Sequence, residues 1–97
     1  MMLENLVRAK GWNKMERVKI YGADWCGDTQ RSLRQLESLG VAYDYVNVED
    51  DAEAANWVKE QNDGKERKPT IKVGEQVLSV PSNQELESAL RAGGLLS

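Results

Sequence analysis

The sequence predicts one α/β domain in which helices flank a four-stranded mixed sheet, with the element order β-α-β-α-β-β-α. Three observations predict this fold class. The chain has 97 residues, of which 40% are hydrophobic, and this is enough for one core. Strand-like and helix-like segments alternate along the chain, as in α/β folds. Near the end, two strand-like runs are separated only by Gly74-Glu75, a pattern suited to a type II′ hairpin turn.

The first half of the chain predicts a βαβ unit behind an N-terminal extension. Residues 1–17 form the extension, which includes a short helix, and residues 18–97 form the domain itself. Residues 18–21 predict a strand that ends at Gly22. Residues 41–48 predict a second strand, because β-branched and aromatic residues dominate them. Between them a helix is predicted over 28–39, because apolar residues recur at helical spacing: Leu33, Leu36 and Leu39. Short connections make the two strands parallel.

The second half predicts a helix, a hairpin and a last helix. Asp50 and Asp51 put carboxylates at the positive end of a helix that runs to about Gln61. Asn62-Asp63-Gly64 ends this helix. The hairpin strands are predicted at 70–73 and 76–80. Ser82 or Asn83 then caps the last helix, in which Leu86, Ala89 and Leu90 share one face.

Composition excludes several classes of function. The net charge is -3 and the 30% of charged residues mix both signs, whereas nucleic-acid binding favours a clustered basic face. No run is long enough for a membrane span and the start has no signal-peptide pattern, so we expect a cytoplasmic protein. One cysteine cannot form an internal disulfide, which fits a reducing compartment. With no histidine and one cysteine, we expect no metal site within the chain.

Cys26 is the candidate catalytic residue. It follows the first predicted strand and a short loop, and it lies at the first turn of the next helix. There the free backbone N–H groups of Asp28 and Thr29 and the helix dipole favour a thiolate, the nucleophilic form of cysteine. The Thr29 hydroxyl is placed to donate to the same sulfur. Against this, the carboxylates of Asp24 and Asp28 disfavour a second negative charge nearby.

A buried and inert cysteine is the alternative, because this is the commoner state of a free cysteine in proteins. The position of Cys26 between Trp25 and Gly27, outside the apolar stripe of the helix, favours the reactive interpretation. Trp25 is predicted to be exposed beside the thiol, where it suits contact with a substrate. Trp12 and Trp57 are predicted to be packing residues.

The stretch Trp25-Cys26-Gly27-Asp28-Thr29 resembles the Trp-Cys-Gly-x-Cys site of mycoredoxins and related glutaredoxin-like proteins of the thioredoxin superfamily, with Thr29 in place of the second cysteine. The similarity runs from Val18 to Leu90. It includes Gly40-Val41-Ala42-Tyr43, Asn62-Asp63-Gly64, Lys68-Pro69-Thr70 and Val80-Pro81-Ser82. The resemblance implies a thioredoxin fold and a glutaredoxin-like site.

This resemblance also implies roles for residues distant from Cys26. Pro69 is expected to be cis and to face Cys26, with a trans proline at the start of a strand as the alternative. The backbone just before it, at Lys68, then pairs with the peptide part of a thiol cofactor. Lys68 replaces an apolar residue of the family, and its ammonium either lies beside Cys26 or is solvated. Ser82-Asn83 replaces a pair of aspartates and offers backbone N–H groups to a carboxylate, although capping alone explains Ser82.

The function implied is that of a monothiol thiol–disulfide oxidoreductase in cell redox homeostasis. Its partners would be protein or small-molecule disulfides, with glutathione, mycothiol or bacillithiol as the low-molecular-weight thiol, and we expect a monomer that binds neither nucleic acid nor membranes. One alternative is a dimer that carries an iron–sulfur cluster between two Cys26 thiolates and two thiol cofactors. Another is a binding module that has kept the fold and lost turnover, because fold does not imply function.

Overall fold

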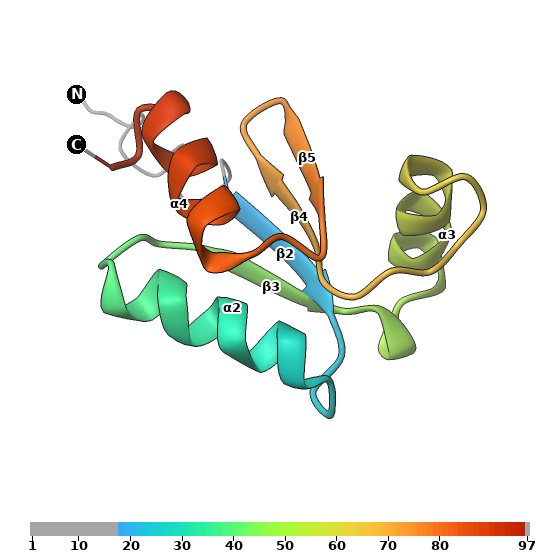
Figure 1. Cartoon of the computed structure of the whole chain (residues 1–97). Coiled ribbons are helices and arrows are strands. Elements are labelled where there is room, and N and C mark those ends of the chain that lie inside the picture. The colour runs from blue at the N-terminus through green and yellow to red at the C-terminus, as the bar shows by residue number, and fades with distance from the viewer. Residues whose placement is uncertain (1–17, 97) are drawn as a thin grey trace, which may run out of the picture.

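The computed structural model describes residues 18–96, which form four strands, three α-helices and one 3-10 turn. Their bounds are β2 (Val18–Gly22), α2 (Gly27–Ser38), β3 (Asp44–Asn47), η1 (Val48–Asp50), α3 (Ala52–Gln61), β4 (Thr70–Val73), β5 (Gln76–Ser79) and α4 (Asn83–Ala92) (Figure 1). The predicted order of strands and helices is confirmed. The predicted extension over residues 1–17, its short helix and Trp12 lie outside the described residues.

The sheet has the strand order β3-β2-β4-β5. Strand β2 is parallel to β3 and antiparallel to β4, and β4 is antiparallel to β5. Tyr21, near the end of β2, pairs with Thr70, the first residue of β4. The loop that leaves β2 toward α2 therefore lies at the same edge of the sheet as the segment that leads into β4. This register brings the neighbourhood of Cys26 close to that of Pro69.

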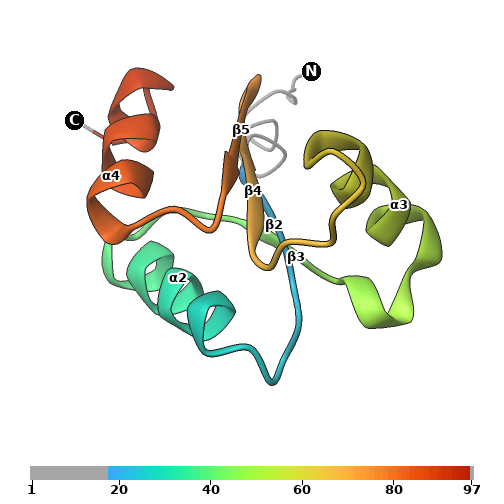
Figure 2. The ribbon, with the colours of Figure 1, turned by 45° about the vertical axis from the view of Figure 1, so that its right-hand side comes forward.

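Helices cover both faces of the sheet, as predicted. In Figure 2, α2 and α4 lie on one side of the sheet and α3 lies on the other. The larger core lies under α2 and α4, and its fully buried side chains include Ile20, Leu36, Ile71, Leu86 and Leu90. Each of these contributes roughly 1.5–3 kcal/mol by leaving water. The smaller core lies under α3 and joins Tyr21 to Val48 and Val58.

Trp57 belongs to this smaller core as a packing residue. Its ring stacks on that of Tyr21, with the centroids 4.5 Å apart. The stacking holds α3 against the end of β2, the strand that leads to Cys26. The prediction that Trp57 packs is confirmed.

The predicted second strand is shorter in the structure at both ends. The backbone of Val41 is used by the helix terminus, since its N–H donates to Leu36 O at 3.0 Å around Gly40, whose φ is 71°. At the other end, the Asn47 side chain accepts from Glu49 N at 3.0 Å and starts the 3-10 turn η1. Local capping of this kind competes with strand pairing, so the strand spans only Asp44–Asn47.

The predicted start of the second helix and end of the hairpin also shift. Asp51 is the N-cap of α3 and accepts from Ala54 N at 3.0 Å, whereas Asp50 belongs to η1. Strand β5 ends at Ser79, one residue early, because Val80 has a φ of 45° and donates its N–H to Pro69 O at 2.8 Å. The turn itself is as predicted: φ is positive at Gly74 and not at the residue after it, as in type II′.

Candidate active site

Cys26 is the N-cap residue of α2. The loop between β2 and α2, at the bottom of Figure 1, brings it there. Its N–H donates to Ala23 O at 3.1 Å, which closes the loop, and its carbonyl accepts from Gln30 N at 3.0 Å, which starts the helix. Its side chain is half-buried. The thiol therefore lies where the free N–H groups of a helix N-terminus converge, as the sequence predicts.

Thr29 lies directly behind the thiol and is fully buried. Its hydroxyl accepts from Ala23 N at 3.4 Å and also hydrogen-bonds to the Cys26 sulfur. The residue fits closely against the end of β2, since a Cβ added at Gly22 would lie 2.4 Å from the Thr29 hydroxyl oxygen. Thr29 thus links the strand end, the loop and the thiol.

The pKa of Cys26 lies below its ordinary value of 9.0. Partial burial raises the pKa of the thiol, and the charge of Asp28 raises it as well. Hydrogen bonds from the Thr29 hydroxyl, the Thr29 N–H and the Asp28 N–H lower this pKa and outweigh both effects. A larger fraction of the sulfur is therefore thiolate near neutral pH than in an ordinary cysteine.

The two carboxylates near Cys26 in sequence have partners of their own. Asp24 accepts a hydrogen bond from the Tyr45 hydroxyl at 2.7 Å, and Asp28 accepts from Arg31 at 3.3 Å. The Tyr45 contact ties the loop before Cys26 to the neighbouring strand β3. The charge of Asp28 raises the pKa of Cys26, but the hydrogen bonds to the sulfur outweigh it.

Pro69 follows a cis peptide bond and is fully buried at the start of β4. The Cys26 thiol donates to the carbonyl of Lys68, the residue just before it, at 3.7 Å. The family resemblance implied both the cis bond and its position opposite the thiol, and the trans alternative is wrong. A main-chain polar group is thereby held at the sulfur, from a segment 42 residues away.

Of the two environments predicted for the Lys68 side chain, the solvated one is wrong. Its ammonium forms an ion pair with Glu66 at 2.9 Å and lies over the Trp25 ring, 5.3 Å from the centroid. Only 17% of the Lys68 side chain is exposed, so it is not a solvated surface lysine. Trp25 itself is 68% exposed, as predicted, and its indole N–H donates to Glu49 at 2.6 Å.

Ser82 and Asn83 lie at the start of α4 and are engaged within the protein. Ser82 and Glu85 form a capping box, in which the Ser82 N–H donates to the Glu85 carboxylate at 2.8 Å. Asn83 accepts from Arg31 through its side chain at 2.8 Å and from Gln35 through its carbonyl at 2.7 Å. The capping explanation of Ser82 is therefore sufficient. These contacts join α4 to α2, the helix that begins after Cys26.

Sequence reasoning missed Arg31, Glu49 and Glu66 as neighbours of the site. Arg31 had a local signal, since it lies three residues after Asp28 and can pair with it on one helix face. Glu49 contacts Trp25 across 24 residues of chain, and no spacing in the sequence indicates that contact. In the sequence, Glu49 belongs only to an acidic turn.

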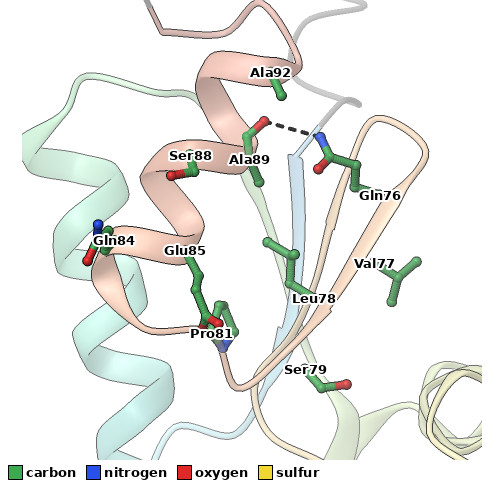
Figure 3. Close-up of a pocket in the computed structure, with 10 residues that line it drawn as sticks. All are labelled: Gln76, Val77, Leu78, Ser79, Pro81, Gln84, Glu85, Ser88, Ala89 and Ala92. Atoms are coloured by element: carbon green, nitrogen blue, oxygen red, sulfur yellow. Dashed lines mark hydrogen bonds between the residues drawn. The ribbon is translucent and has the colours of Figure 1, made fainter.

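A groove of about 650 Å³ lies away from these residues, between β5 and α4 (Figure 3). Leu78, Pro81 and Ala89 supply apolar walls, and Gln76 donates to Ala89 O at 3.2 Å across one end. No cysteine and none of the predicted site residues line this groove, although Pro81 directly precedes Ser82 in the sequence. Nothing in the structure shows what covers it, so we assign it no function.

Between residues 18 and 96, no three side chains of His, Cys, Asp or Glu lie together in a way that would hold a metal ion. Over the same range, no helix has the length and apolar character needed to cross a bilayer.

The fold and the thiol together define a class of protein. A four-stranded mixed sheet between helices, with a thiol at a helix N-terminus opposite a cis-proline that precedes a central strand, is the arrangement of a thioredoxin fold. The sequence profile of the glutaredoxin family matches residues 18–78, which is well over half of the chain. This chain belongs to the glutaredoxin family.

Similar proteins agree with this assignment. Mycoredoxin 1 of Corynebacterium glutamicum is 41% identical over 58 residues, which cover 60% of this chain and 71% of that protein. A Mycobacterium tuberculosis protein, provisionally assigned as a glutaredoxin, is 35% identical over 74 residues, which cover 75% of this chain and 88% of its own. The crystal structure of a variant of a thioredoxin-like protein superposes with a TM-score of 0.71 at 23% identity, over 79% of this chain and 97% of the other. At that identity the superposition confirms the fold alone.

Proposed function

We propose that this glutaredoxin-like redox protein is a monothiol thiol–disulfide oxidoreductase, and that Cys26 is its catalytic residue. The observation that carries the proposal is the thiol itself. Cys26 is accessible, its pKa is lowered by hydrogen bonds, and it is the only cysteine of the chain. The second cysteine position of a dithiol site holds the buried Thr29, so a disulfide within the chain is not available.

The proposed reaction has two exchange steps. The Cys26 thiolate attacks the mixed disulfide between a substrate and a low-molecular-weight thiol, and forms a new disulfide with the sulfur of the small thiol. The substrate leaves as a thiolate and takes a proton from water. A second small thiol, as its thiolate, then attacks the small-thiol sulfur of the mixed disulfide with Cys26. This step releases the small-molecule disulfide and the Cys26 thiolate. The substrate sulfur is reduced to a thiol, and the second small thiol is oxidised as it joins the one released from the mixed disulfide.

The arrangement around Cys26 supports this sequence of steps. The helix N-terminus stabilises Cys26 both as nucleophile and as leaving group. The carbonyl of Lys68 lies at the sulfur, where main-chain groups before Pro69 can pair with a peptide-like thiol as a strand would. Glutathione, mycothiol and bacillithiol all remain candidates. We propose Trp25, Lys68, Ser82 and Asn83 as the surrounding thiol-binding residues.

The setting proposed for this reaction is the cytoplasm, in thiol redox homeostasis, because a reducing compartment regenerates the small thiol. We propose that the enzyme is monomeric, with protein or small-molecule disulfides as partners.

Intact mass measured after exposure to each oxidised small thiol tests the proposal. We expect one adduct per chain, located on Cys26, that the matching reduced thiol removes. Cys26→Ser is the control and should form no adduct. The absence of an adduct with all three thiols would contradict the proposed function. Colour and a dimer after anaerobic purification would instead indicate the cluster carrier.

A further inference from the structure

Three charged side chains of alternating sign form a series of contacts that includes the exposed ring of Trp25, the residue before Cys26. Glu49 accepts from the Trp25 indole N–H at 2.6 Å, the Lys68 ammonium lies over the Trp25 ring at 5.3 Å, and Glu66 pairs with Lys68 at 2.9 Å. These side chains come from three segments: the loop before α2, the turn η1 and the segment before β4. The loop before α2 leads to Cys26 and the segment before β4 leads to Pro69, whereas η1 reaches the ring through Glu49.

Packing alone does not hold the Trp25 ring in place. With 68% of its surface exposed, the ring has few neighbours to fix its rotamer, so its polar contacts set its orientation. The hydrogen bond to Glu49 uses the edge of the indole and is charge-assisted. The contact with Lys68 uses the face and lies within the range of a cation–π interaction. The two contacts do not compete, and a carboxylate on the N–H makes the ring face more attractive to a cation.

Lys68 connects this ring to the reacting sulfur. Its ammonium rests on the ring, while its carbonyl accepts from the Cys26 thiol at 3.7 Å. The Trp25 ring and the Lys68 side chain therefore form a contacting pair whose two residues both adjoin Cys26, Trp25 in the sequence and Lys68 through its carbonyl. Glu49 holds this pair through its hydrogen bond to the Trp25 indole, and it has no contact of its own with Cys26 among the described interactions.

We propose that Glu49 is a positioning residue of this site. It holds the Trp25 ring, and through it Lys68, in the orientation that receives the mixed-disulfide substrate. The inference rests on the proposed function, since it assigns Glu49 to the binding of that substrate. It does not assign Glu49 a part in activating the thiol.

The test compares Glu49→Ala with Asp50→Ala. Both substitutions remove one carboxylate from the turn η1, but only Glu49 touches the Trp25 indole. Glu49→Ala should raise KM for the mixed disulfide about 3- to 10-fold, the factor for losing one modest hydrogen bond. The maximal rate and the pH midpoint of Cys26 alkylation should stay unchanged. Asp50→Ala should change KM little. Glu49→Gln keeps a carbonyl acceptor, and its KM should lie between those of wild type and Glu49→Ala.

The NMR resonance of the Trp25 indole N–H gives a second measurement, assigned by its loss in Trp25→Phe. It should shift and exchange faster with water in Glu49→Ala, and stay in place in Asp50→Ala. An unchanged indole resonance in Glu49→Ala would overturn the inference, as would an equal rise of KM in Asp50→Ala. If the wild type forms no adduct and has no turnover, the proposed function fails. The indole resonance then still decides whether Glu49 holds the ring.

Discussion

Thr29 shows how one buried hydroxyl shapes the chemistry of its neighbour. Its hydroxyl accepts from Ala23 N and hydrogen-bonds to the Cys26 sulfur, while its N–H stabilises the same thiolate. A threonine at this position is therefore more than a missing cysteine. It supplies part of what lowers the pKa of the remaining thiol, and it does so from a fully buried site.

Replacing Thr29 by Val should raise the pKa of Cys26, because the shape is kept and the hydroxyl is lost. Alkylation by iodoacetamide should then be slower at neutral pH and its pH midpoint higher than in wild type. The buried Ala23 N–H also loses its partner, so the free energy of unfolding should fall by about 1–3 kcal/mol. Thr29→Ser is the control, since it keeps the hydroxyl and should keep the midpoint. Equal midpoints in Thr29→Val and wild type would show that the backbone N–H groups act alone.

Replacing Thr29 by Cys should give the protein dithiol behaviour. The Thr29 hydroxyl already hydrogen-bonds to the Cys26 sulfur, so a sulfur placed there lies within reach of a disulfide. After mild oxidation, titration with a thiol reagent should find no free thiol in Thr29→Cys, and reduction should restore two. In Cys26→Ser/Thr29→Cys, the single remaining thiol should stay titratable. If both thiols of Thr29→Cys resist oxidation, the geometry at the start of α2 differs from that described.

At the scale of elements, the site depends on a close approach between β2 and α2. Gly22 ends the strand directly against Thr29, and Gly27 begins the helix in open space. The absence of a side chain is therefore required for packing at Gly22 but not at Gly27. The first allows the helix to approach the strand, whereas the second faces no neighbour within 4 Å.

Gly22→Ala should therefore be strongly destabilising, and Gly27→Ala should not. The Cβ added at Gly22 would lie 2.4 Å from the hydroxyl oxygen and 2.6 Å from the methyl carbon of Thr29, so the buried side chain must move. We expect Gly22→Ala to lower the free energy of unfolding by about 1–3 kcal/mol, as overpacking does. Its Cys26 alkylation should also slow, because Thr29 moves away from the sulfur. Denaturant unfolding of both variants provides the comparison, and equal stabilities would contradict the close packing.

At the scale of the whole molecule, the order of elements and both faces of the sheet could be predicted from the sequence. Leucines at helical spacing, such as Leu36, and the Gly74 turn carry strong local signals, and both predictions are confirmed. Element ends were predicted less well. The Asn47 side chain forms a local hydrogen bond to Glu49 N, and the Val80 N–H donates to Pro69 O, and each of these contacts lies where a strand ends early.

The candidate site divides in the same way. The place of Cys26 at a helix start followed from residues close to it in the sequence, and the place of Pro69 opposite it followed from the family resemblance. Contacts between distant segments, such as Trp25 with Glu49 and Lys68 with Trp25, depend on side-chain directions that only the folded chain defines. Exposed contacts of this kind leave no periodic pattern, whereas buried ones do.

The pH dependence of stability is a property of the whole molecule, since titrating groups in three regions contribute to it. All three tyrosines have a pKa above the ordinary value of 10.0. Burial raises the pKa of Tyr21 and Tyr45, with nearby carboxylates adding to it, and the hydrogen bond to Glu37 raises that of Tyr43. Cys26 differs, because its pKa is lowered in the folded state.

These pKa shifts predict opposite effects of pH on the free energy of unfolding, one above about pH 10 from the tyrosines and one below about pH 9 from Cys26. A raised tyrosine pKa means that the unfolded chain loses its protons first. The stability contributed by the tyrosines is therefore complete below about pH 10 and is lost as pH rises through their folded pKa values. The contribution of Cys26 is complete above about pH 9 and is lost as pH falls through its lowered pKa.

Tyrosinate absorbance followed against pH checks the tyrosine part directly. The folded protein should titrate above pH 10 and the chain in denaturant near it, and the midpoint of denaturant unfolding should fall as pH rises above about 10. Tyr45→Phe removes the hydroxyl that donates to Asp24, so its alkaline loss of stability should be smaller than that of wild type. Cys26→Ser provides the matching control at the lower end, where it should abolish only the loss below pH 9 that is due to the thiol. A folded protein whose tyrosines ionise at their ordinary pKa would contradict the hydrogen bonds of Tyr43 and Tyr45. The Tyr45 hydrogen bond is also the contact that ties the loop before Cys26 to the sheet, so that contact would be contradicted as well.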